Sequence, residues 1–135
     1  MQIKTIIRAG AFSGATAVAL GAFGAHGLQS MVEKGSLTDH DLSIYETAVR
    51  YQMYHTFALL AAAALQQWLS PKSQHRSALL FIFGMIIFSG SLYLLALSPV
   101  IFGSQVSWLG AITPLGGVAF IAGWLTLFFG AAAKN

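Results

Sequence analysis

The chain has no cysteine and very little charge. The absence of cysteine from its 135 residues excludes disulfides, thiolate-bound metals and iron–sulfur clusters, and it leaves histidine, carboxylate and methionine as potential metal ligands. Charged residues make up only 8% of the sequence, whereas soluble domains average about 25%. Hydrophobic residues account for 56%. This composition predicts a membrane protein.

The first long apolar run begins close to the N-terminus. Residues 9–32 contain no acid, lysine or arginine, and roughly 20 such residues are enough to cross the hydrocarbon core. We therefore predict a helix at about residues 5–28. Lys4 and Arg8 ahead of it could instead belong to a signal peptide with a cleavage site near residues 22–25. We favour a membrane helix, because the apolar part of a secretory signal is only about 7–15 residues long.

All four acidic residues lie in the segment that follows, between Gln29 and Arg50. Thr38 and Asp41 have the spacing of a capping box, with Asp in place of the usual Glu. They predict a helix at about residues 39–69. We expect its first three turns to project beyond the hydrocarbon and its charge-free part, Tyr51 to Pro71, to form a second span.

Residues 70–76 (SPKSQHR) read as a short polar turn, and residues 77–133 contain no acid, lysine or arginine. A single helix of that length is far too long for one crossing, so the chain must fold back. Proline and glycine cluster between Ser98 and Gln105, which places the break there. We predict helices at about 77–97 and 106–130. Residues 1–135 are thus predicted to form a single transmembrane domain, an all-α four-helix bundle.

The basic residues predict the orientation of the bundle. With four spans, one side collects Lys4, Arg8, Lys72, Arg76 and Lys134. The other side has Lys34 and Arg50 together with all four acids. Because basic residues are enriched in cytoplasmic segments, both termini are expected in the cytoplasm of a multi-pass protein of the bacterial inner (plasma) membrane. The net charge of +3 is dispersed and forms no patch, so nucleic acid is not expected as a partner.

Polar residues are expected to form a layer in the outer half of the bundle, because polar groups in a membrane face the interior or water. The candidate residues of this layer are His26, Glu46, Arg50, Tyr51, Gln52, His55, Ser89, Ser91, Tyr93 and Thr113. The spacing of Glu46 and Arg50 favours an ion pair. Two interpretations of the stretch around them remain open: a proton-relay, ligand or headgroup site, and an ordinary interfacial helix end.

The sequence contains no catalytic motif such as GxSxG or HExxH. His26 and His55 on adjacent helices could share a metal, with Met31 or Met53 as a softer ligand, but two histidines without a motif favour hydrogen-bonded structural roles. Ser89 or Ser91 with a histidine and Glu46 could be imagined as a triad, although serine in a membrane helix is more often used for packing. We therefore expect no enzyme activity, no metal and no cofactor.

Small residues form stripes along the first and last predicted helices, where they allow close helix contact. The residues expected to support helix packing are Gly10, Gly14, Gly21, Gly110, Pro114, Gly117 and Gly123. Pro114, with glycines after it, is also expected to bend or open the last helix. Packing within the bundle and contact with a second subunit or partner both remain open as the use of these faces.

Four blocks of the sequence resemble one known family. They are GAFGAHGL at 21–28, YETAVRYQMYHTFALL at 45–60, SGSLYLLAL at 89–97 and ITPLGGVAFIAGW at 112–124. Together, in this order, they resemble the domain-of-unknown-function 423 family of small bacterial inner-membrane proteins, which is related to the eukaryotic transmembrane protein 256. The resemblance covers nearly the whole chain. It implies a four-helix inner-membrane protein with no established activity.

These observations favour a non-enzymatic membrane protein that acts through self-association, contact with membrane lipids or membership of a larger membrane complex. The alternative is a small transporter or channel whose pathway is lined by His26, Tyr51, His55 and Tyr93, with Pro114 as a bend. A membrane enzyme or a metal or haem carrier is the third class, and it depends on the two histidines alone.

Overall fold

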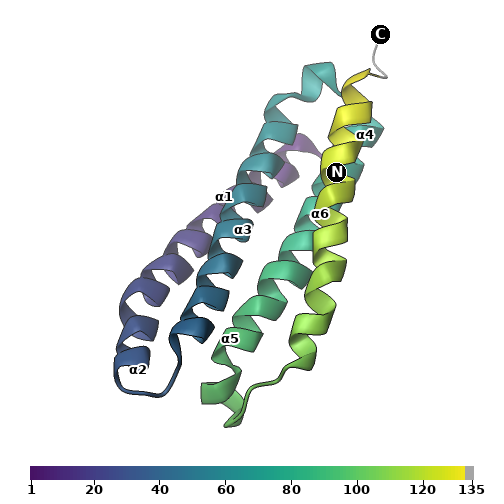
Figure 1. Cartoon of the computed structure of the whole chain (residues 1–135). Helices are drawn as coiled ribbons and strands as arrows, with labels where there is room; N and C mark the ends of the chain where they lie inside the picture. Colours follow the sequence, from purple (N-terminus) through teal and green to yellow (C-terminus); the bar gives the residue numbers. More distant parts are fainter. Residues whose placement is uncertain (133–135) are drawn as a thin grey trace.

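A computed structural model describes residues 1–132, so Lys134 lies outside the described residues. Within 1–132 every regular element is helical and there is no strand, which confirms the predicted all-α class. Four helical runs lie alongside one another, joined by short connections (Figure 1).

The first run is longer than predicted. It comprises α1 (Ile3–Phe23), the π-helical turn η1 (Gly24–Leu28) and α2 (Gln29–Glu33). It ends just before Gly35, whose φ of +76° is a left-handed conformation that favours glycine. The backbone N–H of Ser36 then bonds back to the carbonyl of Met31 at 2.9 Å, so Gly35 is a helix-ending signal that the sequence reading overlooked.

The second run begins with the predicted capping box and consists of α3 (Asp39–Ala64), followed by the short 3₁₀ turn η2 (Gln66–Trp68). The Thr38 hydroxyl accepts a hydrogen bond from the Asp41 amide at 3.1 Å, and the Asp41 carboxylate accepts one from the Thr38 amide at 2.9 Å. The helix starts where the capping box places it.

The third run differs most from its prediction, because residues 71–76, expected to be a turn, are helical. It consists of α4 (Pro71–Gly84), the π-helical turn η3 (Met85–Ser89) and α5 (Gly90–Phe102). The helix starts at Pro71 rather than at 77, because the Ser70 hydroxyl accepts a bond from the Ser73 amide at 3.1 Å and proline is suited to the first helical position.

The expected break after Leu97 also falls later, because α5 continues through Pro99. Proline has no N–H for the carbonyl of Leu95, and the Ser98 hydroxyl donates to that carbonyl instead, at 2.7 Å. Gly103, with φ +74°, ends the helix. The last run, α6 (Trp108–Ala132), stays helical through Pro114, so the predicted opening of this helix is not seen. Pro114 lies inside α6, one turn beyond its first turn, and has no N–H for the carbonyl of Gly110.

The helices pack in series rather than all against one another. α3 packs on α1 at one side and on α4, η3 and α5 at the other, while α6 packs on α4, η3 and α5. Figure 1 shows α1 and α3 adjacent on one side and α6 beside α4 and α5 on the other. The third run therefore separates α6 from α1.

Three helical runs are long and apolar enough to cross a membrane: Ile3–Glu33, Pro71–Phe102 and Trp108–Ala131. α3, which contains most of the second predicted span, does not meet this criterion among the described residues. The residues responsible are Arg50, Gln52 and His55, each of which lowers its hydropathy. α3 has helices packed on two sides, and it buries Gln52 and His55 there.

The start of α1 and the end of α6 both lie beside the start of α4. The amino group of Met1 is hydrogen-bonded to Nδ1 of His75, and a Cβ on Gly130 would meet the Ser73 side chain. The described residues at both ends of the chain, together with Lys72 and Arg76, thus lie at one end of the molecule. The loops at 34–38 and 103–107 lie at the opposite end.

Candidate functional site

The polar residues near the middle of the helices form two separate groups rather than one layer. The first, the central polar network, links the first three helical runs and consists of Ser13, Thr16, Gln52, Thr56 and Tyr93. The second, the aromatic–histidine cluster, lies between α3, the third run and α6 and consists of Tyr51, His55, Phe81, Phe88, Phe120 and Trp124.

Gln52 is the centre of the polar network and lies 9% exposed on α3. Its amide nitrogen donates to the Ser13 carbonyl at 3.0 Å and to the Thr16 hydroxyl at 2.9 Å, both on α1. Its amide oxygen accepts a hydrogen bond of 2.8 Å from the Tyr93 hydroxyl on α5. One side chain therefore ties three helices together.

A second contact lies one turn along α3 from Gln52. The hydroxyls of Ser13 and Thr56 are 2.6 Å apart. The Thr56 hydroxyl also donates to the Gln52 carbonyl at 2.8 Å, and the Ser13 hydroxyl lies 3.4 Å from the sulfur of Met85. Because Thr56 donates to a carbonyl within its own helix, the Ser13 hydroxyl is the donor across the pair.

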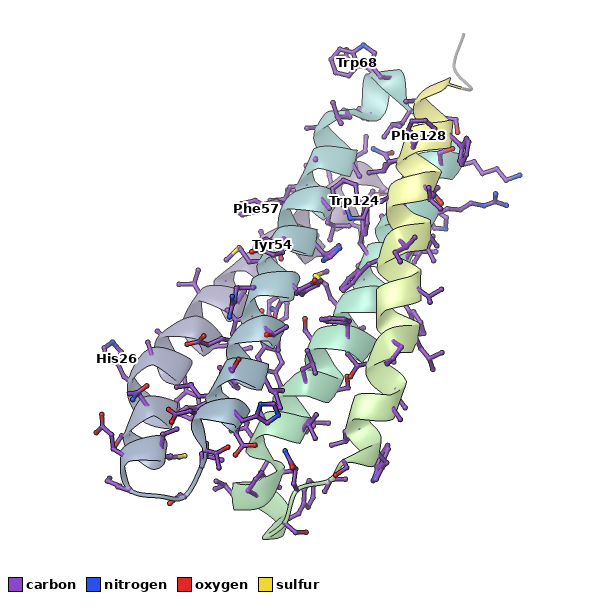
Figure 2. The ribbon with its side chains drawn as sticks, in the orientation of Figure 1. His26, Tyr54, Phe57, Trp68, Trp124 and Phe128 are labelled. Atoms are coloured by element: carbon purple, nitrogen blue, oxygen red, sulfur yellow. The ribbon has the colours of Figure 1, made fainter. Side chains whose placement is uncertain are left out.

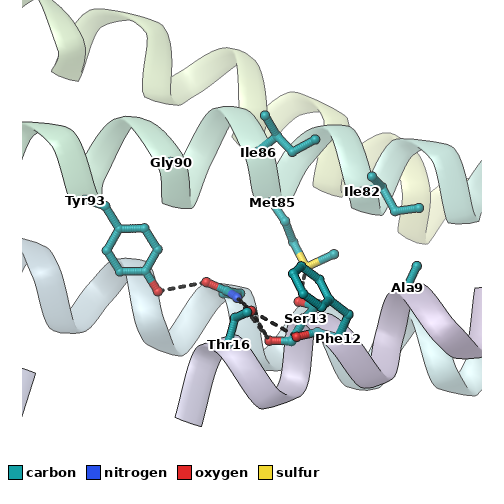
Figure 3. A pocket seen from close by; sticks show the side chains of 10 residues that line it. Ala9, Phe12, Ser13, Thr16, Ile82, Met85, Ile86, Gly90 and Tyr93 are labelled. Atoms are coloured by element: carbon teal, nitrogen blue, oxygen red, sulfur yellow. Dashed lines mark hydrogen bonds between the residues drawn. The ribbon is translucent and has the colours of Figure 1, made fainter. Parts of the chain in front are cut away.

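A groove of about 350 Å³ lies over this network, between α1 and the third run (Figure 3). Its floor contains Ser13, Thr16, Gln52 and Tyr93, while the rest of its lining is apolar apart from the sulfur of Met85. Phe12 and Ile86 line it and are themselves exposed to 73% and 65%. The groove therefore opens to the outside of the helices, and it is not an internal channel.

The aromatic–histidine cluster surrounds His55, which is 5% exposed. The imidazole stacks on Phe120, with centroids 3.4 Å apart and planes inclined by 6°. Its Nδ1 lies 2.8 Å from the Tyr51 carbonyl, and its Nε2 accepts a hydrogen bond of 3.3 Å from the indole of Trp124. These bonds define a neutral ring, with the proton on Nδ1.

Other predicted polar residues connect neighbouring helices outside these two groups. The Ser89 hydroxyl donates to the Ala48 carbonyl at 2.8 Å, joining η3 to α3. The hydroxyls of Ser91 and Thr113 are 2.7 Å apart and join α5 to α6. The membrane interior supplies no water to such hydroxyls, so they bond to a neighbouring helix instead. These hydroxyls therefore serve helix packing.

His26 and His55 do not come together. His26 is exposed and points away from the helices (Figure 2). Gly24, two residues before it, contacts Tyr45, which lies ten residues before His55 on α3, or about 15 Å along the helix. His55 faces Phe120 and Trp124 of α6 instead. The shared metal site considered from the sequence therefore has no geometric support, and no cluster of three or more His, Cys, Asp or Glu occurs in residues 1–132.

Glu46 and Arg50 form the predicted ion pair, with a distance of 3.3 Å between carboxylate oxygen and guanidinium nitrogen. Both side chains are 56% exposed. An exposed pair of this kind contributes little to stability. Its position on the outward side of α3 agrees with an interfacial helix end.

The glycines that we expected to support packing are used within the chain. A Cβ on Gly10 would lie 2.6 Å from Leu60, and one on Gly123 would lie 2.6 Å from Phe81. A Cβ on Gly14 or Gly21 would lie 3.3 Å from Thr56 or Val49 of α3, whereas a Cβ on Gly110 or Gly117 would be farther, at 3.6 Å from Leu95 and 3.9 Å from Phe88. These helix faces are therefore covered by other helices of the same chain.

Sequence reasoning missed several residues that build the site. Ser13, Thr16, Thr56 and Trp124 were not among the candidates. A signal was present for two pairs: Ser13 with Thr16, and Gln52 with Thr56, are polar residues three and four apart in otherwise apolar stretches, a spacing that places both on one helix face. Gly84 was also missed; a side chain there would clash with Phe120.

Comparison with known proteins identifies one family of membrane proteins. A family model described as "Protein of unknown function (DUF423)" matches residues 20–117. A UPF0382 membrane protein of Staphylococcus epidermidis is 48% identical over 125 residues, 93% of each chain. The UPF0382 membrane protein YwdK of Bacillus subtilis is 44% identical over 126 residues, which cover 93% of this chain and 94% of YwdK. No solved structure matches.

Proposed function

This chain belongs to the DUF423 family, and from that premise we propose that it is a multi-pass protein of the bacterial inner (plasma) membrane. Its four helical runs form one membrane bundle with both termini in the cytoplasm. The end that holds Lys4, Arg8, Lys72 and Arg76 carries the excess of basic residues expected of the cytoplasmic side. The opposite end carries the acidic loop.

The orientation can be tested by labelling single cysteines, since the natural chain has none. Lys34→Cys and Lys72→Cys form a matched pair, because both side chains are exposed and lie at opposite ends. In spheroplasts a membrane-impermeant maleimide is expected to label Lys34→Cys, and to label Lys72→Cys only after permeabilisation. The reverse pattern would contradict the proposed orientation.

We further propose that the protein has no catalytic activity and acts by associating with lipid, with further copies of itself or with a larger membrane complex. The observation that carries this proposal is the outer surface of α1 and α6. Phe12 and Phe128 are exposed to 73% and 70%, and Figure 2 shows Phe128 on the outer side of α6. Buried side-chain polar atoms in the described part of the chain all have partners, and large apolar side chains are exposed along α1 and α6.

Native mass spectrometry of the protein, gently extracted from its own host with lipids retained, tests this proposal. Retained lipid, a homo-oligomer or a complex with other proteins is the expected result. A monomer that carries no lipid or protein and catalyses turnover in an assay would overturn it. The exposed face of α6 is the first surface to mutate if a protein partner is found, because the glycine faces are already covered.

A transporter or channel remains the second candidate, supported by the polar network at the middle of the helices. The four residues expected to line its path face different neighbours, however. His26 is exposed, Tyr51 and His55 face α6, and Tyr93 bonds to Gln52 beside α1. Flux in proteoliposomes that is unchanged by His55→Ala combined with Tyr51→Phe would remove this version of the pathway.

A further inference from the structure

The groove between α1 and the third run has a composition that suits a particular kind of ligand. It lies at the middle of the helical runs, opens to the exterior, and has polar side chains only at its floor (Figure 3). Lipid chains offer no partners to such groups. We propose that the groove binds the hydroxyl group of a neutral, membrane-soluble alcohol, with the apolar body of the alcohol against Phe12 and Ile86.

The hydrogen bonds at the floor determine which group is recognised. The Tyr93 hydroxyl donates its proton to Gln52 Oε1. Both amide protons of Gln52 are donated to α1, to the Ser13 carbonyl and the Thr16 hydroxyl. What remains available are lone pairs on the Tyr93 and Gln52 oxygens. The floor is therefore an acceptor surface. It fits a ligand that donates a hydrogen bond, and a hydroxyl is the donor that a neutral lipid carries.

The lining also excludes other classes of lipid. It contains no lysine, arginine or histidine, so nothing in it pairs with a phosphate headgroup. A plain acyl chain would fill the apolar part but leave the acceptor oxygens of the floor against hydrocarbon. A neutral alcohol satisfies both parts of the groove.

The wall formed by the third run is built in a way that keeps the groove open. Met85 and Ile86 belong to the π-helical turn η3, and single π-helical turns in α-helices are frequent at functional sites. A Cβ added to Gly90, which also lines the groove, would meet no atom within 4 Å. Gly90 thus differs from Gly84 and Gly116, which lie where the third run packs on α6 and where a side chain would clash.

Photolabelling of the full chain in nanodiscs tests the proposal. The probes are 1-hexadecanol bearing a diazirine in its chain and the methyl ether of the same compound, which lacks the donor. The alcohol is expected to label residues 9–16 and 82–93, and the ether to label them about fivefold less, as the loss of one hydrogen bond implies. Equal labelling by both probes, or no labelling of these segments by the alcohol, would overturn the proposal.

Two variants test the position of the site. Gly90→Leu places a side chain in the open groove and is expected to abolish selective labelling, whereas Ala111→Leu puts a leucine at an exposed position of α6 outside the groove. Phe12→Ala removes an exposed wall residue and is expected to weaken labelling without disturbing buried packing. Wild-type labelling of Gly90→Leu, with helix content and monodispersity retained, would contradict the assignment.

This inference depends on the proposed placement of α1 and the third run in the membrane. The two proposals fail in different measurements. A wrong orientation appears in the cysteine labelling of Lys34→Cys and Lys72→Cys, whereas a wrong ligand class appears only in the comparison of alcohol and ether.

Discussion

The indole of Trp124 on α6 donates a hydrogen bond of 3.3 Å to the imidazole Nε2 of His55 on α3. These two helices are joined mainly through the third run, which packs against both. The bond is a direct polar link between α3 and α6, and it lies beside the stack of the His55 imidazole on Phe120. It also uses the second ring nitrogen of His55, since the first bonds to the Tyr51 carbonyl.

Trp124→Phe should destabilise the protein by about 1 kcal/mol, because it removes this hydrogen bond but keeps an aromatic ring against Phe81. The free energy of unfolding in bicelles, followed by steric trapping, provides the measurement. Trp108→Phe is the matched control, because Trp108 is 65% exposed. An equal loss of stability in both variants would show that the bond to His55 contributes nothing specific.

Ser13 and Thr56 should be energetically coupled across α1 and α3. Their hydroxyls are 2.6 Å apart and buried, and hydrogen bonds between membrane helices contribute about 0.6 kcal/mol on average, with a maximum near 1.7. A double-mutant cycle with Ser13→Ala and Thr56→Val is expected to give a coupling energy in this range. Strict additivity of the two substitutions would contradict the contact.

Two alanine substitutions in the helices should have opposite outcomes. A Cβ at Gly116 would clash with the backbone of Phe88, whereas one at Gly90 would meet nothing within 4 Å. Gly116→Ala should cost about 1–3 kcal/mol through overpacking, while Gly90→Ala should be neutral or slightly stabilising. Thermal unfolding of the two purified variants makes the comparison. A loss at Gly90 as large as that at Gly116 would show that the third run is packed differently.

Thr38→Ala should destabilise the start of α3 by about 1 kcal/mol, the usual effect of losing an N-cap side chain. The hydroxyl of Thr38 bonds both to the amide and to the carboxylate of Asp41. Hydrogen exchange at the amide of Asp41 should accelerate in this variant. Gln105→Ala serves as the control. It removes the longer bond of 3.3 Å from Gln105 to Asp41 and leaves the bonds of the cap intact. Unchanged exchange in Thr38→Ala would count against the cap.

Sequence patterns predicted those parts of the fold that depend on local chemistry. The capping box at Thr38 and Asp41, the ion pair of Glu46 with Arg50 and the all-helical class follow from spacing and composition. The helix start at Pro71 was predictable in the same way, because Ser70 and Pro71 form a helix-start signal. It was overlooked because the charges of Lys72 and Arg76 suggested a polar turn.

Which side chains meet in the site could not be predicted from the pattern of any single helix. Gln52 was a candidate, but its partners Thr16 and Tyr93 belong to other helices, and helix rotation decides which residues meet. His26 and His55 show the same limit: both lie on neighbouring helices, but His26 faces outward and His55 faces α6. The two π-helical turns change helix rotation partway along the first and third runs, and periodicity at 3.6 residues does not predict them.

The polar character of α3 has a consequence for how the chain enters the membrane. With Arg50, Gln52 and His55 in its sequence, α3 does not meet the hydropathy of a span by itself, and such residues are unfavourable for translocon-mediated insertion. In the folded chain α1 supplies the Ser13 carbonyl and the Thr16 hydroxyl to the amide of Gln52. Fused to an insertion reporter, α3 should integrate poorly alone and efficiently behind α1, and equal integration in both settings would contradict this. We therefore expect the first two helices to enter the bilayer as a hairpin, with α1 as the insertion partner of the helix that follows it.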